Sequence, residues 1–119
     1  MAAHNELGKW GEEVAVRYLR RNGWYIRHRD WRFGHRDIDI VATDEYGTKV
    51  VFVEVKARRD RSVTDPELAV DRDKILNLRQ AANAYVKQFH LNADLRFDII
   101  TVVGTGDDDV QIDHIENAF

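Results

Sequence analysis

The spacing of apolar positions divides the chain into helical and extended segments. Over residues 6–22 apolar side chains recur every three or four positions, which predicts an opening helix. The stripe comprises Trp10, Val14 and Tyr18, with Leu7, Gly11, Ala15 and Leu19 beside it. Asn5 is the expected N-cap, and Gly23 the expected residue just after the last turn.

A second helical pattern covers residues 66–89. Pro66 suits the first helical position, with Asp65 as the cap before it. The predicted inner side consists of Leu68, Ile75, Leu78, Ala82, Tyr85 and Val86. Residues 58–65 before this helix are polar and are expected to form a loop.

The remaining apolar runs predict strands. They cover residues 24–28, 37–43, 49–57, 96–103 and 110–115, and residues 30–34 are expected to form a strand end and a turn. The resulting order is α-β-β-β-α-β with one added strand. We therefore predict a single α/β domain over residues 1–119, with a central mixed sheet flanked by helices.

Two charged residues interrupt the most apolar strand. Side chains alternate along a strand, so Glu54 and Lys56 share a face with Val50 and Phe52, while Val51, Val53 and Val55 share the other face. Charges in such a strand cost several kcal/mol unless they are paired or bind a metal. An ordinary ion pair on a solvated face is the alternative, and the apolar residues on both sides weaken it.

Acidic residues also precede this strand. Asp37 and Asp39 alternate with isoleucines in the neighbouring strand, and a short hairpin turn would bring them beside Glu54. The Ile38 and Ile40 neighbours favour a functional role for Asp39, whereas Asp37 suits a strand-capping role equally well. Carboxylates gathered in this way bind Mg²⁺, which assists phosphodiester hydrolysis together with a nearby lysine.

Glu12, in the first helix, is a further candidate. Its neighbours Ala15, Val16 and Leu19 are apolar, so its side chain can lean toward the sheet and complete a metal site. An early-turn acid that interacts with the helix dipole is an equally good interpretation. The sequence leaves both open.

Charge is distributed unevenly along the chain. The net charge is −3, yet residues 1–61 hold 13 Lys and Arg against 10 Asp and Glu, while residues 62–119 hold 5 against 11. The basic residues that surround the candidate site are Arg27, Arg29, Arg32, Arg36, Arg58, Arg59 and Arg61. A basic rim of this kind attracts phosphates, although solvated surface charge explains the same composition.

Composition narrows the class of protein. The chain is 44% hydrophobic and 33% charged, which is typical of a globular domain. The absence of cysteine excludes disulfides and thiolate metal sites. No signal-peptide pattern and no apolar run of about 20 residues is present, so we expect a cytoplasmic protein without a membrane partner.

Several of these segments resemble the YraN-type uncharacterised bacterial proteins, small relatives of the archaeal Holliday junction resolvases in the PD-(D/E)xK restriction-endonuclease-like superfamily. The most specific match is the block at residues 51–56 with Arg58, which follows the block at residues 38–42. The other matching pieces are Gly11-Glu12 with Ala15 and Tyr18-Leu19, Ala69-Val70 with Lys74, Ala82 with Tyr85, and Arg96-Phe97-Asp98.

The resemblance implies a restriction-endonuclease-like fold and a metal-dependent nuclease site for Mg²⁺ or Mn²⁺. It implies that Asp39, Glu54, Glu12 and the Val55 carbonyl are metal ligands and that Lys56 is the catalytic lysine. Arg58 and Lys74 would contact phosphate, together with Arg36 of the basic rim. Where the family has Gly-Glu, this chain has Arg36-Asp37, and the shorter acid leaves the number of metals open.

The expected substrate is branched or otherwise non-B-form DNA, because a domain of 119 residues has little spare surface for reading sequence. Resolvase relatives act as dimers, so the resemblance implies a homodimer as one arrangement, while the residues leave the oligomeric state open. The alternative is a nucleic-acid-binding or assembly module that kept the nuclease fold without turnover. A purely structural domain with a Glu54–Lys56 ion pair is a third interpretation, which predicts no response to metal.

Overall fold

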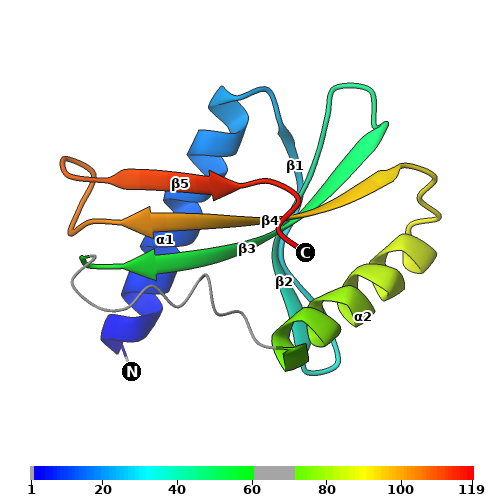
Figure 1. Cartoon of the computed structure of the whole chain (residues 1–119), viewed down its shortest axis with the longest axis horizontal. Coiled ribbons are helices and arrows are strands. Elements are labelled where there is room, and N and C mark those ends of the chain that lie inside the picture. Colours follow the sequence, from blue (N-terminus) through cyan, green and yellow to red (C-terminus); the bar gives the residue numbers. More distant parts are fainter. Residues whose placement is uncertain (1, 61–71) are drawn as a thin grey trace.

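The computed structural model describes residues 2–60 and 72–119, and its elements follow the predicted order. They are α1 (Ala2–Arg21), β1 (Tyr25–Phe33), β2 (Arg36–Thr43), β3 (Lys49–Arg58), α2 (Arg72–Gln88), β4 (Asp94–Val103) and β5 (Gln111–Ile115) (Figure 1). This arrangement confirms the predicted α/β class, with its α-β-β-β-α-β core and one added strand.

All five strands form one mixed sheet in the order β1-β2-β3-β4-β5. Only β3 and β4 are parallel, and every other neighbouring pair is antiparallel. Parallel neighbours need a long crossover, and α2 lies within the segment that connects β3 to β4. The sheet twists so strongly that β1 and β2 run steeply across the direction of β4 and β5 (Figure 1).

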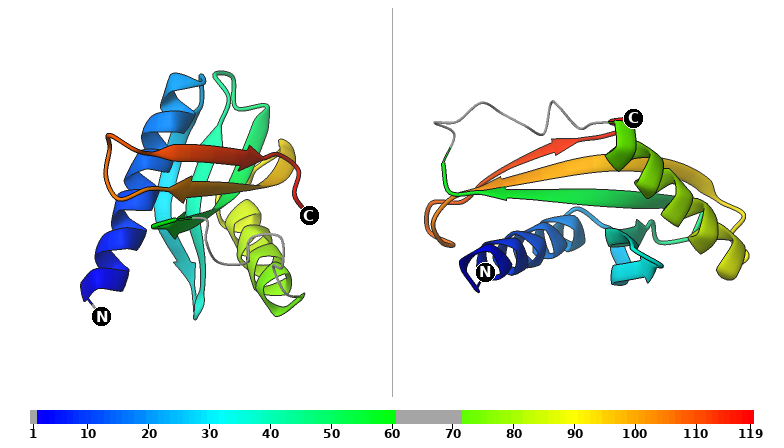
Figure 2. Two further views of the ribbon diagram at one scale, coloured as in Figure 1. Left: turned by 60° about the vertical axis from the view of Figure 1, so that its left-hand side comes forward. Right: turned by 90° about the horizontal axis from the view of Figure 1, so that it is seen from below.

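Each face of the sheet packs against one helix (Figure 2). On the α1 face, the buried helix residues Val14, Ala15, Val16 and Leu19 pack on Ile40, Ala42, Val51, Val53, Ile100 and Val102. On the α2 face, Leu78, Ala81, Ala82 and Tyr85 pack on Ile38, Val41, Val50 and Phe52. The predicted alternation of β3 is therefore confirmed, with Glu54 on the α2 face.

Helix α1 lies in close contact with the sheet at Gly11. A Cβ atom on this residue would lie 2.6 Å from the Cβ of Ala57 in β3. A contact that short does not occur between real side chains, so glycine lets the helix backbone lie directly on the strand. The next residue is Glu12, whose height above the sheet is therefore fixed by this contact.

Several predicted boundaries were wrong. Asn5 lies inside α1 and is not its cap, because the helix already begins at Ala2. The first strand extends to Phe33, beyond the predicted 24–28, because Gly34 and His35 form a two-residue hairpin turn. Gly34 has a φ of 65°, which suits the first central position of such a turn. Asp30 has a φ of 49° and stays within β1.

Other boundaries were predicted well. Helix α1 ends as expected before Gly23, whose N–H donates to the Arg20 carbonyl while the Trp24 N–H donates to the Leu19 carbonyl. The predicted start of the second helix at Pro66, its Asp65 cap, and the residues Arg61 and Leu68 lie outside the described residues. Within the described part of the chain, no helix is both long and apolar enough to cross a bilayer.

Candidate metal centre

The candidate centre lies where β2 and β3 separate. Residues 40–43 of β2 pair with residues 50–53 of β3, and β2 then remains paired with β1 alone. Strand β3 continues beside β4 as far as Arg58. Asp39 lies at this fork, and its Oδ2 accepts a hydrogen bond of 2.8 Å from the Val55 N–H. The carboxylate thus satisfies a backbone donor that the sheet leaves open.

Three carboxylates converge beside the fork. Oxygens of Glu12 from α1, Asp30 from β1 and Asp39 from β2 lie within 4.8 Å of one another. Asp30 lies across from Asp39, between the paired positions Arg29–Ile40 and Trp31–Ile38. The group therefore draws on a helix and two strands, and each of its members offers the oxygen ligands that Mg²⁺ and Mn²⁺ prefer.

These carboxylates line an open cleft of about 350 Å³. The other lining residues are Gly8 and Lys9 of α1, Arg32 of β1 and Val55 of β3. Lys9 and Arg32 give this acidic cleft two cationic neighbours. Small-ligand sites have volumes of about 300–1,000 Å³, so the cleft has room for a hydrated cation and part of a phosphodiester.

Burial and neighbouring acids raise the pKa of two of these carboxylates, Asp39 and Glu12. Burial raises the pKa of Asp39 to about 7, and the charges of Glu54, Asp37 and Glu12 contribute, against the opposing effect of the Val55 N–H. Burial also raises the pKa of Glu12, assisted by Asp30, while Arg29 acts in the opposite direction. A bound cation would lower these pKa values again, since a nearby opposite charge favours the ionised form of a carboxylate.

Arg29 anchors Glu12 from the neighbouring strand. Its Nε lies 3.3 Å from Oε1 of Glu12, and its Nη2 lies 3.0 Å from Oε2 of Glu13. The Glu12 side chain is largely shielded, with 13% exposure, whereas that of Glu13 is 49% exposed. Of the two alternatives for Glu12, the geometry matches the one in which its side chain faces the sheet.

Glu54 lies on the α2 side of the fork, among ammonium groups. Its Oε2 lies 3.3 Å from Nζ of Lys56 and 2.9 Å from Nζ of Lys74 in α2, and its side chain is only 7% exposed. Burial lowers the pKa of Lys74, but the hydrogen bond and charge of Glu54, with the charges of Asp39 and Asp37, raise it above its ordinary value. The charge of Glu54 contributes to the raised pKa of Asp39, but Glu54 does not belong to the three-carboxylate group.

The backbone of Val55 serves the same fork. In a strand, the N–H and C=O of one residue point to the same neighbouring strand. The Val55 N–H donates to Asp39, so its carbonyl is directed to the same side. This is the position that the sequence predicts for a backbone ligand.

The predicted phosphate contacts are dispersed. Lys74 reaches Glu54, as described above, whereas Arg58 ends β3 and is half-buried, with its carbonyl accepting from the Gly104 N–H. Arg36 lines a different groove, beside α2. Of the predicted basic rim, Arg32 lines the carboxylate cleft.

Sequence reasoning did not identify Asp30 or Lys9. Asp30 falls in a segment predicted as a turn, so no register with Asp39 was assigned. The sequence does contain a signal for Asp30, namely the possible two-residue turn at Gly34-His35. In a hairpin with that turn, residues at equal distances from it pair with each other, so residue 30 lies opposite residue 39. Lys9 carries no comparable signal, since surface lysines are common on helices.

Comparison with known proteins gives one consistent result. The pattern of UPF0102, an uncharacterised protein family, matches residues 11–102. A UPF0102 protein of Bacteroides thetaiotaomicron is 51% identical over 119 residues, which are 100% of this chain and 96% of that protein. UPF0102 proteins of Phocaeicola vulgatus and Syntrophomonas wolfei are 44% and 39% identical, over 100% and 98% of this chain and 96% and 99% of their own lengths. The predicted YraN-type membership is thereby confirmed: the chain belongs to the uncharacterised protein family UPF0102.

Proposed function

We propose that this protein is a metal-dependent endonuclease that hydrolyses phosphodiester bonds in branched or otherwise non-B-form DNA. The observation that carries the proposal is the convergence of Glu12, Asp30 and Asp39 within 4.8 Å in an open cleft. Three like charges at this separation repel one another, and a hard divalent cation offsets the repulsion while leaving coordination positions for water and phosphate.

The donor set fits Mg²⁺ or Mn²⁺. Asp39, Glu12 and Asp30 would hold the ion, with the Val55 carbonyl as a further oxygen ligand. When bound, such an ion polarises a phosphate oxygen and lowers the pKa of a coordinated water. Asp39 is held in place by the Val55 N–H, and Glu12 by Arg29.

Lys56 and Lys74 supply positive charge on the other side of the fork. Both ammonium groups contact Glu54, which is also close enough to raise the pKa of Asp39. In the proposed reaction, Lys56 stabilises the negative charge that accumulates on the phosphate, and Glu54 positions the lysine. Lys9 and Arg32 lie at the cleft itself and would bind the neighbouring backbone phosphates.

The test has a binding arm and a cleavage arm. Mn²⁺ is titrated by calorimetry into wild type and Asp39→Asn in the presence of a non-cleavable DNA junction, and cleavage of a labelled junction is measured in parallel. We expect Asp39→Asn to lose the metal heat, and we expect Lys56→Ala to cleave about 10²–10³ times more slowly. Asp108→Asn, an exposed acid in the β4–β5 turn, is the matched control. Wild-type cleavage by either site variant would contradict the assignment.

A non-catalytic nucleic-acid-binding or assembly module is the second candidate. The pairing of Glu54 with two lysines favours it, because those contacts already neutralise one of the predicted metal ligands. Such a module would bind DNA with a steep dependence on salt and would show no metal heat in either protein. The same titration therefore separates the two candidates.

A further inference from the structure

A second concave site lies between α2 and the tip of the β1–β2 hairpin. This groove has a volume of about 560 Å³. Its polar and aromatic lining consists of Phe33, Arg36, Gln80, Asn83, Lys87 and Gln88. We refer to it as the Phe33 groove. It shares no lining residue with the carboxylate cleft.

The strand side of the Phe33 groove offers an aromatic ring and a cation. Phe33 is 48% exposed, so part of its ring is accessible to a ligand in the groove. Arg36 follows it across the hairpin turn, and its Nε is buried without a hydrogen-bond partner among the described residues. A buried donor of this kind is costly unless a ligand or water satisfies it.

The helix side offers amides and a second cation. Gln80, Asn83 and Lys87 are spaced three and four residues apart, so they lie on one face of α2. Side-chain amides both donate and accept hydrogen bonds, as the edge of a nucleobase requires. Lys87 lies in the last turn of the helix, and its ammonium is suited to phosphate.

From these features we infer that the Phe33 groove binds one unpaired nucleotide of a DNA strand. The base stacks on Phe33, its edge meets the amides of Gln80 and Asn83, and its phosphate lies between Arg36 and Lys87. Aromatic stacking with amide contacts to base edges is the usual way proteins hold unpaired bases. A volume near 560 Å³ is within the range of single small-ligand sites.

The inference rests on the proposed function and specifies its substrate. Arg36 and Asp39 lie three residues apart in the same strand, so the groove and the cleft are neighbours along β2. A DNA molecule that places a phosphodiester at the carboxylates therefore has a nearby nucleotide available to the groove. Base-paired DNA keeps its bases stacked inside the helix, so only an unpaired segment can fill the site.

Fluorescence anisotropy tests this proposal with two probes, a blunt duplex and the same duplex carrying a short unpaired arm with 2-aminopurine. Ca²⁺ replaces Mg²⁺ so that binding is measured without cleavage. We expect wild type to prefer the armed duplex and to quench the 2-aminopurine. We expect Phe33→Ala to weaken binding of the armed duplex by about 10-fold while binding of the blunt duplex is unchanged. Lys87→Gln, at an exposed position in the last turn of α2, should weaken the same preference.

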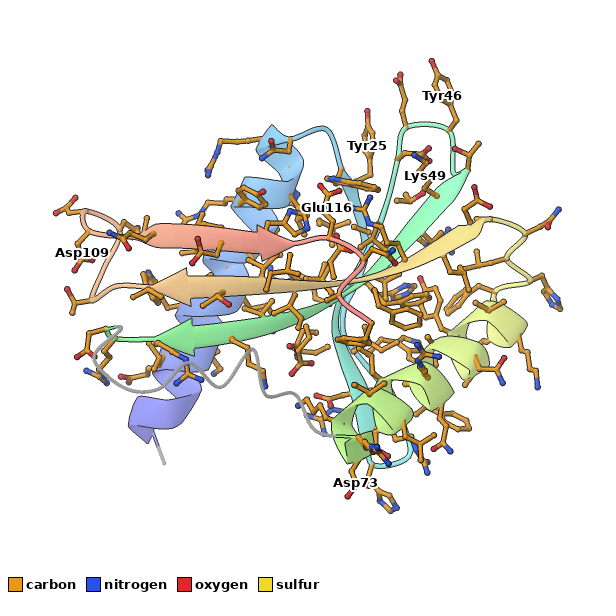
Figure 3. All side chains as sticks on the ribbon, in the orientation of Figure 1. Tyr25, Tyr46, Lys49, Asp73, Asp109 and Glu116 are labelled. Carbon is orange, nitrogen blue, oxygen red and sulfur yellow. The ribbon has the colours of Figure 1, made fainter. Side chains whose placement is uncertain are left out.

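The matched control is Tyr46→Ala. Tyr46 is 82% exposed on the loop between β2 and β3, well away from α2 (Figure 3). The substitution removes an exposed aromatic ring that does not line the groove, so this variant should bind both duplexes like wild type.

The outcomes separate the groove from the catalytic proposal. Junction cleavage that persists while Phe33→Ala and Lys87→Gln bind both probes like wild type would overturn the groove and leave the nuclease intact. Loss of the armed preference in both variants, without metal-dependent cleavage by wild type, would support the groove and overturn the nuclease. Competition by free deoxyadenosine monophosphate as effective as by the armed duplex would assign the groove to a free nucleotide and overturn our inference.

Discussion

The carboxylates of Asp98 in β4 and Asp39 in β2 are both enclosed by the sheet, but they meet different partners. Asp98 has no solvent exposure. Its Oδ1 accepts from Arg96 Nε at 2.9 Å and from the Asn117 N–H at 3.0 Å, and its Oδ2 from Arg96 Nη2 at 2.8 Å. Nε2 of His114 lies 2.7 Å from the same Oδ2. Burial raises the pKa of Asp98, but these partners outweigh it and leave the pKa lowered.

Among the described residues, Asp39 meets one hydrogen-bond donor and several acids. The Val55 N–H is its hydrogen-bond donor, and Glu54, Asp37 and Glu12 add negative charge, so its pKa rises to about 7. The two aspartates show that burial does not decide the role of an acid. An acid with its own cations stabilises the fold, whereas an acid placed among other acids leaves a demand for a cation from outside.

The largest effect should follow from Asp98→Asn. The substitution removes the charge of a buried carboxylate that pairs with Arg96 and contacts His114, and breaking a buried ion pair typically costs about 3–5 kcal/mol of unfolding free energy. Urea denaturation at neutral pH measures the loss, with Asp108→Asn as the exposed control, expected within about 0.5 kcal/mol of wild type. Because the pKa of Asp98 is lowered, its contribution is present above the ordinary pKa and lost as the pH falls through the folded value. If Asp98→Asn were as stable as wild type at pH 7, Asp98 would not stabilise the fold, and the proposed difference between Asp98 and Asp39 would be wrong.

Asp39→Asn should act in the opposite direction. The asparagine oxygen can still accept the Val55 N–H, while the repulsion from neighbouring acids is lost. The rise in pKa from 3.8 to about 7 sets an upper limit of about 4 kcal/mol, and partial solvation of the site reduces our expectation to about 2 kcal/mol gained at pH 8. The measurement is urea denaturation with EDTA present, to keep metal out of the cleft.

The gain from Asp39→Asn should depend on pH. Between about pH 4 and 7 the folded wild type holds a proton that the unfolded chain has released, so wild-type stability falls as the pH rises through this window. The variant cannot titrate at this position, so its advantage should shrink toward zero near pH 4. An advantage that stayed constant from pH 4 to 8 would show that the repulsion around Asp39 is not its source.

A smaller effect should follow from Gly11→Ala. Alanine improves helix propensity by about 1 kcal/mol, but its Cβ would lie 2.6 Å from that of Ala57, and overpacking typically costs about 1–3 kcal/mol. We expect a net loss of about 1 kcal/mol and, because Glu12 moves with the helix, about 10-fold weaker Mn²⁺ binding by calorimetry. Gly8→Ala is the matched control for the stability measurement, since its Cβ meets nothing within 4 Å and should stabilise the helix. Unchanged Mn²⁺ affinity in Gly11→Ala would separate Glu12 from the metal site.

Local patterns were sufficient to predict most of the fold. The 3.6-residue period predicted which side of each helix is buried. The alternation in β3 predicted correctly that Glu54 and Lys56 lie on the same face of the strand as Val50 and Phe52. The strand containing Trp31 was predicted too short, because its polar and aromatic residues lack clean alternation. Its true length depends on pairing with β2 along the whole hairpin.

The candidate site was harder to predict, because it depends on contacts between distant elements. Lys74 meets Glu54 only after α2 has packed on the sheet. Residues 36–39 of β2, which precede Ile40, do not pair with β3, and this separation directs Asp39 toward Val55 and leaves Arg36 beside α2. No local pattern encodes such a separation, so the sequence predicted Arg36 as a phosphate contact in the basic rim around the candidate site, whereas it lines the other groove.

Because β2 separates from β3, the end of the β1–β2 hairpin nearest its turn holds Arg36 and Asp39 at a fixed distance from each other. The hairpin is clamped from one side by α1, through Arg29 and Glu12, and from the other by α2, through the Trp31 and Tyr85 rings. Arg36 and Asp39 are three residue steps apart along β2, a backbone distance of about 10 Å. If both proposals hold, this distance determines how many nucleotides separate the unpaired nucleotide in the Phe33 groove from the phosphodiester that is hydrolysed at the carboxylates. The ends of the cleavage products would then record the geometry of β2.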